Sequence, residues 1–401
     1  MNASAPPSPE TKATLLLCGR FGPARDGIKL LSPSEYHDLA QWLDARRLTL
    51  GDLLGTDAQP ILRACAGRPW TMDRVLALLG RTDELSRALE RWSHTGIWVV
   101  GHTDPEYPAR LRQRLKMAAL PLLFGAGPRT LLDRGGVCVV GSRDSSDAAL
   151  EFARLIGRRC GREGMTVVSS DMRGVDREAV SAAHDAGGQV VCVLSDCLEK
   201  ALGAKRHRDA LGAKTLAMVT PFSPDTRFKV ANAIRANKYQ YGLSDVAVIV
   251  ETREKGGVWL GAEENRHEGW VPAFVCAGET MPSSNRALLY LGLLPITRQD
   301  VERRESLRDF FIAHGLSARS ATADSKAAGA PVPISQPAAP VDLYSVFEAE
   351  LRSIVAAAPR CEADIAAHFG IERCQARRWL ARALADGAIR KADGAERYTA
   401  R

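Results

Sequence analysis

Short apolar runs alternate with amphipathic segments along the middle of the chain. Val137–Val140 is too short for a helix and rich in β-branched residues, so it predicts a buried strand. Ala148–Arg158 then carries its apolar residues on one face, which predicts a helix. The pattern continues with a strand at Met165–Ser169, a helix at about Gly174–Ala186 and a strand at Gln189–Leu194. This βαβαβ order predicts a parallel sheet with right-handed crossovers.

The same pattern extends the core in both directions. Apolar residues at three- and four-residue spacing predict short helices over residues 32–93. Further strands are predicted at Gly96–Val100, Leu120–Gly127, Leu216–Val219, Asp245–Glu251 and Pro272–Cys276. We therefore expect the α/β fold class, with an extended Rossmann-like core on a parallel sheet and an N-terminal helical domain.

The end of the chain has a different character. Residues 317–340 consist largely of Ala, Ser, Pro and Gly, which predicts a flexible linker. Three predicted helices and a strand–turn–strand follow, the order of a winged helix. Such a module binds DNA or docks proteins, and four arginines of its third helix are candidate DNA contacts: Arg373, Arg377, Arg378 and Arg382. The expected division is a flexible N-terminus with room for a short strand (1–31), a helical domain (32–95), the core (96–316), the linker (317–342) and the winged helix (343–401).

Two turns of the core share one design. Gly141-Ser142-Arg143 follows one predicted strand, and a polar turn that ends at Arg173 follows the next. Ligands of parallel sheets lie outside the carboxyl ends of the strands, and helix N-termini there attract anions. Arginines add charge-assisted donors. One such turn is ordinary, but two at one edge predict an anion site.

Composition narrows the choice of ligand and compartment. The 401 residues carry a net charge of +7, which suits a polyanionic partner. The nine cysteines show no metal-ligand spacing, so we expect reduced thiols, no metal and no disulfide framework. No phosphate loop or dinucleotide fingerprint follows the first core strand, and we expect no cofactor. No membrane span or signal peptide is visible, and we expect a cytoplasmic protein without membrane contacts.

From about Gly96 to Gly292 the chain resembles the DNA-processing protein A (DprA/Smf) family. The residues that carry the resemblance are Tyr107–Leu111, Val137–Arg143, Val168-Ser169, Arg173–Asp176, Ala186–Leu194, Asn237-Lys238, Gly242–Asp245 and Gly256-Gly257. The resemblance implies a dimeric cytoplasmic protein that binds single-stranded DNA and helps to load the RecA recombinase onto it in natural transformation. It also implies that the chain is not an enzyme, because the family has no established reaction, so no catalytic residue is expected.

The family's DNA pocket maps onto named positions of this chain. We add Ser169, which precedes the second turn, and Gly257, which opens a predicted helix. The candidate DNA-binding residues are then Gly141, Ser142, Arg143, Ser169, Arg173, Gly174, Asp176, Arg235, Asn237, Lys238 and Gly257. The chain departs from the family pattern at Ser170 and Ala236, which stand where glycine and arginine are usual. Asp171 and Asp196 add negative charge to the same edge.

Some roles stay open at this point. Tyr239 and Tyr241 are candidates for base stacking or for core packing. A second hypothesis is a nucleotide-binding or nucleotide-sensing protein with Asp171, Asp176 or Glu264 as general base or ribose anchor. A third is a winged-helix DNA-binding regulator.

Overall fold

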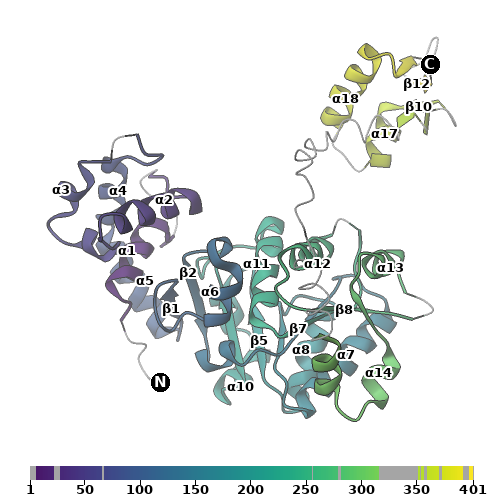
Figure 1. Cartoon of the computed structure of the whole chain (residues 1–401), viewed down its shortest axis with the longest axis horizontal. Coiled ribbons are helices and arrows are strands. Elements are labelled where there is room, and N and C mark those ends of the chain that lie inside the picture. The colour runs from purple at the N-terminus through teal and green to yellow at the C-terminus, as the bar shows by residue number, and fades with distance from the viewer. Residues whose placement is uncertain are drawn as a thin grey trace, which may run out of the picture. The chain divides into compact units, whose positions relative to one another are not determined.

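The structure is a computed structural model of the whole chain (Figure 1). It describes residues 6–21, 28–65, 67–254, 256–278, 281–315, 351–352, 354–355, 359–369, 373–391 and 397–400. The chain divides into two compact units, Met1–Thr322 and Ala323–Arg401. The predicted linker (317–342) lies outside the described residues.

The first unit is built on one sheet of nine strands. Their order across the sheet is β1-β2-β6-β5-β4-β3-β7-β8-β9. The strands are β1 Trp98–Gly101, β2 Leu122–Ala126, β3 Val137–Val140, β4 Val167–Ser169, β5 Val190–Val193, β6 Leu216–Thr220, β7 Val246–Ile249, β8 Ala273–Cys276 and β9 Leu294–Ile296. The α/β class and each strand predicted for the core are therefore confirmed, while β9 was not predicted.

The sheet is mostly, but not wholly, parallel. Strands β3, β4, β5 and β6 pair in parallel, as do β3, β7, β8 and β9. At the other edge β1 pairs antiparallel with β2, and β2 pairs antiparallel with β6. The expectation of a parallel sheet is confirmed for β3 to β9 and is wrong at this edge. The apolar pattern gives the existence of a strand but not its direction.

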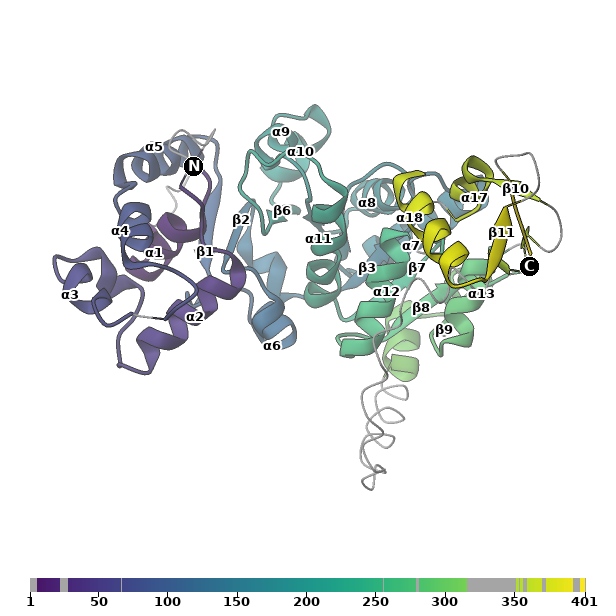
Figure 2. The same ribbon diagram turned by 90° about the horizontal axis from the view of Figure 1, so that it is seen from above.

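Helices cover both faces of the sheet (Figures 1 and 2). Residues of α7 to α10 join one hydrophobic core with Val137 and Val139, whereas residues of α6 and α11 to α13 join a second core with Cys138 and Val140. Alternate residues of β3 thus face opposite layers, as in a strand buried on both sides. The helices are α6 Ala109–Leu115, α7 Asp147–Arg162, α8 Val175–Asp185, α9 Leu198–Leu202, α10 Lys205–Gly212, α11 Val230–Leu243, α12 Gly257–Glu268, α13 Ser283–Tyr290 and α14 Arg298–Arg303, with 3-10 turns η2 Lys116–Ala118 and η3 Arg129–Asp133.

Helices α1 to α5 gather beside β1 (Figure 2). They are α1 Pro9–Cys18, α2 Pro33–Asp44, α3 Ala58–Leu62, α4 Met72–Leu79 and α5 Thr82–His94, with the 3-10 turn η1 Gly51–Leu54. The flexible start expected over 1–31 is wrong for α1, whose Ala13 and Leu15–Leu17 are buried. Ser8 caps this helix, and the hydroxyls of Ser8 and Thr11 each donate to Asp104 at 2.6 Å. The helix is thereby fixed to the loop that follows β1.

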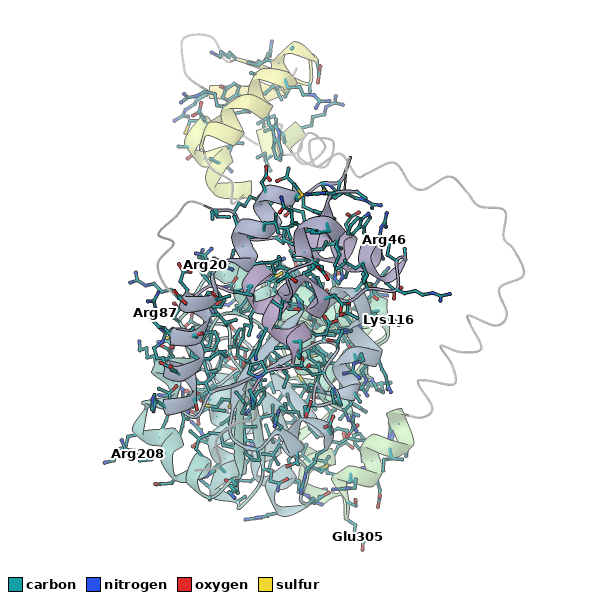
Figure 3. The ribbon with its side chains drawn as sticks, turned by 90° about the vertical axis from the view of Figure 1, so that its left-hand side faces the viewer. Arg20, Arg46, Arg87, Lys116, Arg208 and Glu305 are labelled. Carbon is teal, nitrogen blue, oxygen red and sulfur yellow. The ribbon has the colours of Figure 1, made fainter. Side chains whose placement is uncertain are left out.

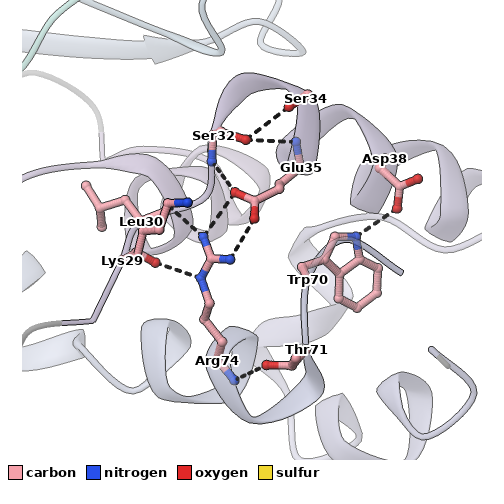
Figure 4. A network of polar contacts seen from close by, with 9 residues as sticks. All are labelled: Lys29, Leu30, Ser32, Ser34, Glu35, Asp38, Trp70, Thr71 and Arg74. Carbon is pink, nitrogen blue, oxygen red and sulfur yellow. Dashed lines mark hydrogen bonds and ion pairs between the residues drawn. The ribbon is translucent and has the colours of Figure 1, made fainter. Parts of the chain in front are cut away.

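A polar network joins α4 to the N-terminus of α2 (Figure 4). Ser32 and Glu35 form a capping box at the start of α2. The Arg74 guanidinium donates to both oxygens of Glu35, at 2.7 and 3.0 Å, and to the carbonyls of Lys29 and Leu30. Hydrogen bonds from Arg74 lower the pKa of Glu35 to about 2, although burial opposes them.

The second unit contains helices and a small three-stranded sheet. Helices α17 Glu362–Phe369 and α18 Arg373–Ala385 precede β11 Ile389–Lys391 and β12 Arg397–Ala400. Strand β12 pairs antiparallel with β11 and with β10 Arg360–Cys361. All four arginines predicted as DNA contacts lie on α18. Arg377 pairs with Glu362, and Arg382 lies 3.6 Å from Asp386.

The described part of the chain contains no helix that is long and apolar enough to span a bilayer. The eight cysteines with described side chains are free thiols. Among the described residues, no cluster of three or more His, Cys, Asp or Glu side chains could ligate a metal ion.

Candidate functional site

Two turns meet at the carboxyl edge of β3 and β4. The first runs from Gly141 to Ser146, where the Ser146 hydroxyl caps α7. The Ser142 N–H donates to the Glu251 carbonyl at 2.8 Å, and the Glu251 carboxylate accepts from the Ser146 hydroxyl at 2.7 Å. Glu251, two residues after the end of β7, therefore holds the turn that follows β3.

Glycine allows the second turn to pack against the first. Gly174, at the start of α8, has a φ of +96°, and a Cβ there would lie 2.4 Å from the Ser142 carbonyl oxygen. A Cβ on Gly141 would lie 2.5 Å from the Val175 side chain. Only residues without a side chain permit this approach, which places two helix N-termini at one edge.

The buried Asp176 carboxylate is hydrogen-bonded to both turns. It accepts a hydrogen bond from the Gly141 N–H at 3.0 Å and another from the Ser170 hydroxyl. Burial raises the pKa of Asp176 to about 6, and these hydrogen bonds only partly oppose the effect. This carboxyl is therefore close to half-protonated in mildly acidic solution.

Two neighbouring cavities open at this edge. The first, here called the glycine cavity, has a volume of about 320 Å³ and is lined by Gly141, Ser142, Asn237, Gly257 and the start of α11. The second, here called the arginine cavity, has a volume of about 630 Å³ and reaches α9 and α10. Both are lined by Arg143, Asp144, Ser170 and Met172. These four residues form the ridge between them.

Arg143 is the exposed cation of this ridge. Its guanidinium lies 4.5 Å from the centre of the Phe228 ring, and its Nη2 atom lies 3.5 Å from the Met172 sulfur. Phe228 is 38% exposed, and Val230 beside it is 65% exposed. A cation stacked on an aromatic ring keeps its outward donors free for a ligand.

Some predicted residues lie at the cavities and others do not. Arg173 lines the arginine cavity and pairs with Asp144. Asn237 lines the glycine cavity and donates to the Gly257 carbonyl at 2.7 Å. Ser169 is fully buried and donates to the Val139 carbonyl, so its predicted ligand contact is wrong.

Helix α11 contributes less than the sequence predicted. Arg235 is exposed but lines neither cavity. Lys238 donates to Glu264 at 2.6 Å and also lines neither cavity. Tyr239 and Tyr241 are each 1% exposed within the second core, so base stacking on them is wrong and core packing is confirmed. The exposed aromatic residue of this edge is Phe228, which the sequence reasoning did not select.

The arginine cavity contains cations that were not predicted. They are Arg177 on α8, Lys200 on α9 and Arg206 on α10. Asp171 also behaves differently from expectation: it is buried, and its Oδ2 atom accepts from Arg206 at 2.8 Å and faces His207 Nε2 at 2.9 Å. Burial would raise its pKa, but the hydrogen bonds from His207 and Arg206 prevail and lower it. Asp171 is thus a neutralised carboxylate rather than a free negative charge.

The part of the chain that is similar to known proteins contains both turns. Residues 98–283 match the family described as DNA recombination-mediator protein A. The chain is 23% identical to the DNA processing protein DprA of Bacillus subtilis over 188 residues, which are 46% of this chain and 63% of that protein. It is 25% identical to the protein Smf of Synechocystis sp. over 252 residues, which are 57% of this chain and 63% of that protein. In each case the match spans less than two thirds of the relative.

A solved structure agrees in fold. The DNA processing protein A (DprA) from Streptococcus pneumoniae aligns with a TM-score of 0.54 at 20% identity, over 68% of this chain and 92% of that chain. At this level of identity the likeness establishes the architecture.

Proposed function

Because the chain belongs, through residues 98–283, to the DNA recombination-mediator protein A family, we propose that it binds single-stranded DNA and serves DNA recombination. In this proposal the carboxyl edge of β3 and β4 holds the phosphate backbone. No covalent bond of the DNA is broken.

One observation carries the proposal: Arg143 stands between two cavities that receive helix N-termini and further arginines. Phosphates are bound in proteins by arginine, lysine and backbone N–H groups, and these contacts are independent of base sequence. We therefore expect tight, salt-sensitive binding with little preference for sequence.

The apolar surface beside Arg143 favours the binding of single-stranded DNA over duplex DNA. Phe228 and Val230 present apolar surface beside the Arg143 guanidinium. Bases of a single strand can stack on such a surface, whereas a duplex keeps the faces of its bases in its own stack. We expect one base of the bound strand to lie over Phe228.

The carboxylates argue against a nucleotide hydrolase. Asp171 is held by Arg206 and His207, and Glu264 is held by Lys238. Asp176 is buried and accepts from Gly141 and Ser170. Asp171 and Asp176 are thus buried and hydrogen-bonded, and the partly exposed Glu264 carboxylate is paired with Lys238, so none of the three is a free general base.

The test compares three ligands on the full chain by fluorescence anisotropy. Labelled oligo-dT should bind, a duplex of equal length should bind more weakly, and an unlabelled mononucleotide should not displace the oligonucleotide. A variant with Arg373→Ala and Arg382→Ala should retain single-strand binding. Binding restricted to duplex and lost in that variant would favour the regulator, and displacement by the mononucleotide would favour the nucleotide-binding protein.

Three finer proposals accompany the main one. The second unit, with two helices followed by paired strands β11 and β12, supports a winged helix as the module of residues 343–401. The boundaries 32–95 for a helical domain and 96–316 for the core are also proposed. The family further supports a cytoplasmic homodimer that assists RecA loading, which RecA pull-down and light scattering of the purified chain test directly.

A further inference from the structure

The arginine cavity adjoins the glycine cavity but extends to a different part of the fold. It lies where the turn after β4 meets the α9–α10 segment, and five cationic and three carboxylate side chains line it. The cationic residues are Arg143, Arg173, Arg177, Lys200 and Arg206; the acidic ones are Asp144, Asp171 and Asp196. The cavity therefore has an excess of positive charge, which attracts an anion.

Two of the three carboxylates, Asp144 and Asp171, already have partners at the cavity wall. Asp144 pairs with Arg173. Asp171, 7% exposed, accepts from Arg206 and His207, and Arg177 Nε lies 4.0 Å from its other oxygen. The cationic heads of Arg177 and Arg206 thus share one buried counter-charge, and Lys200 is exposed at the mouth. The surplus charge is available to a ligand.

The backbone at Asp171 indicates that this arrangement is fixed. Asp171 has a φ of +56°, a conformation that aspartate adopts at an energetic cost. Its contacts with Arg206 and His207 offset that cost and hold α10 against the turn. Preorganised cations lose less side-chain entropy when a ligand binds.

The two cavities adjoin each other at the ridge. Both are lined by Arg143, Asp144, Ser170 and Met172, so a chain that leaves the glycine cavity over Arg143 enters the arginine cavity directly. Two adjoining cationic sites can bind successive phosphates of one single strand. A mononucleotide occupies only one of them.

We propose that the arginine cavity is a second phosphate subsite, in which Lys200, Arg206 and Arg177 hold the internal phosphates of the strand beyond Arg143. The proposal rests on the proposed function and deepens it. It defines a direction for the strand, from α11 and α12 towards α9 and α10.

The test uses the full chain and oligo-dT of about 4 to 16 nucleotides, the range of typical single-strand sites. Lys200→Ala and Arg206→Ala should each weaken the binding of the longer oligonucleotides roughly fivefold, which is the effect of losing one charge-assisted contact. Each should also reduce the slope of log K against log salt by about 0.7. The shortest oligonucleotide, which fills only the glycine cavity, should bind as it does to the unmodified chain.

Arg208→Ala is the matched control. Arg208 lies on α10 two residues from Arg206, but it does not line the cavity and points away from the protein (Figure 3). It should leave every affinity unchanged. Arg206→Ala removes a hydrogen bond to the buried Asp171 and could impair folding. Lys200→Ala replaces an exposed side chain, so it tests the subsite without that effect.

The outcomes separate the two proposals. Loss of binding in Arg143→Ala without any effect of Lys200→Ala on long oligonucleotides overturns the second subsite and leaves the proposed function intact. An equal loss of affinity for the shortest and the longest oligonucleotides also overturns the second subsite, because only a long oligonucleotide extends into it. No binding of single strands by the unmodified chain overturns both.

Discussion

Asp144 and Arg173 form an ion pair that joins the turn after β3 to the turn after β4. The side chains are 58% and 73% exposed respectively, so the pair is solvated and contributes at most about 1 kcal/mol to folding. A phosphate at this edge must compete with the Asp144 carboxylate for the guanidinium. Asp144 therefore opposes the ligand that we propose.

Replacing this carboxylate should strengthen DNA binding. Asp144→Asn removes a negative charge and frees Arg173, and we expect affinity for oligo-dT to rise roughly fivefold at low salt, equivalent to about 1 kcal/mol. The melting temperature should hardly change. Anisotropy titration and thermal unfolding measure the two quantities, and weaker binding by the variant would contradict our assignment of the anion site.

Affinity should also depend on pH through Asp176. Burial raises the pKa of Asp176 to about 6. Below that pH the carboxyl is neutral and no longer repels a phosphate in the glycine cavity, so oligo-dT binding should strengthen as pH falls through about 6. Titration of the full chain across this range measures the effect.

Asp176→Asn separates this carboxyl from other titrating groups. The amide is neutral at every pH and keeps an oxygen for the Gly141 N–H, so its binding curve should lose the step near pH 6. The same step in both proteins would assign the pH dependence to another group.

Gly174 should be required for the approach of the two turns. Alanine would place a Cβ 2.4 Å from the Ser142 carbonyl at a φ of +96°, so we expect Gly174→Ala to lose more than about 3 kcal/mol of stability, and oligo-dT affinity with it. Gly187→Ala is the control, because Gly187 has a φ of +76° with no atom within 4 Å of the added Cβ. It should lose only about 1–2 kcal/mol. Urea unfolding of both variants tests the difference, and equal losses would mean that contact between the turns is unimportant.

Arg74 should stabilise the N-terminal helices in a pH-dependent manner. The pKa of Glu35 is about 2 in the folded chain against an ordinary 4.5, so the pair contributes stability above pH 4.5 that is lost as pH falls towards 2. Arg74→Ala should lose about 2 kcal/mol at neutral pH, because Glu35 keeps a buried charge without its partner. The gap between the two proteins should close in acid, as measured by urea midpoints. A gap independent of pH would show that Arg74 acts through packing alone.

The core was predictable because its pattern is local. Val137–Val140 and Val246–Ile249 are short apolar runs bounded by polar turns, and each became a strand at the expected place. Helix α10, Lys205–Gly212, has the sequence KRHRDALG, whose few apolar residues give no clear period. The sequence reasoning therefore missed α10 and, with it, Arg206. Helix α1 had a readable signal, since Ser8-Pro9-Glu10 precedes an apolar run, but the surrounding prolines favoured a flexible reading.

The site was predictable only as far as its turns. Gly141, Arg143 and Arg173 follow strands, and the topology of a parallel sheet brings them to one edge. Partnerships across the chain were invisible: Lys238 pairs with Glu264 twenty-six positions away, and Asp171 pairs with Arg206 thirty-five positions away. The inward orientation of Tyr239 and Tyr241 depends on how α11 packs, which a helical period alone does not determine.

The most direct test of the central claim is a salt titration of oligo-dT binding to the unmodified chain and to Arg143→Ala. Arg87→Ala, an outward-pointing arginine on α5, is the control (Figure 3). We predict that Arg143→Ala binds more weakly at every salt concentration and that its log–log slope is shallower by about 0.7, the contribution of one phosphate contact on a single strand. Coincident curves for Arg143→Ala, Arg87→Ala and the unmodified chain would contradict the claim that this edge of the sheet holds the DNA backbone.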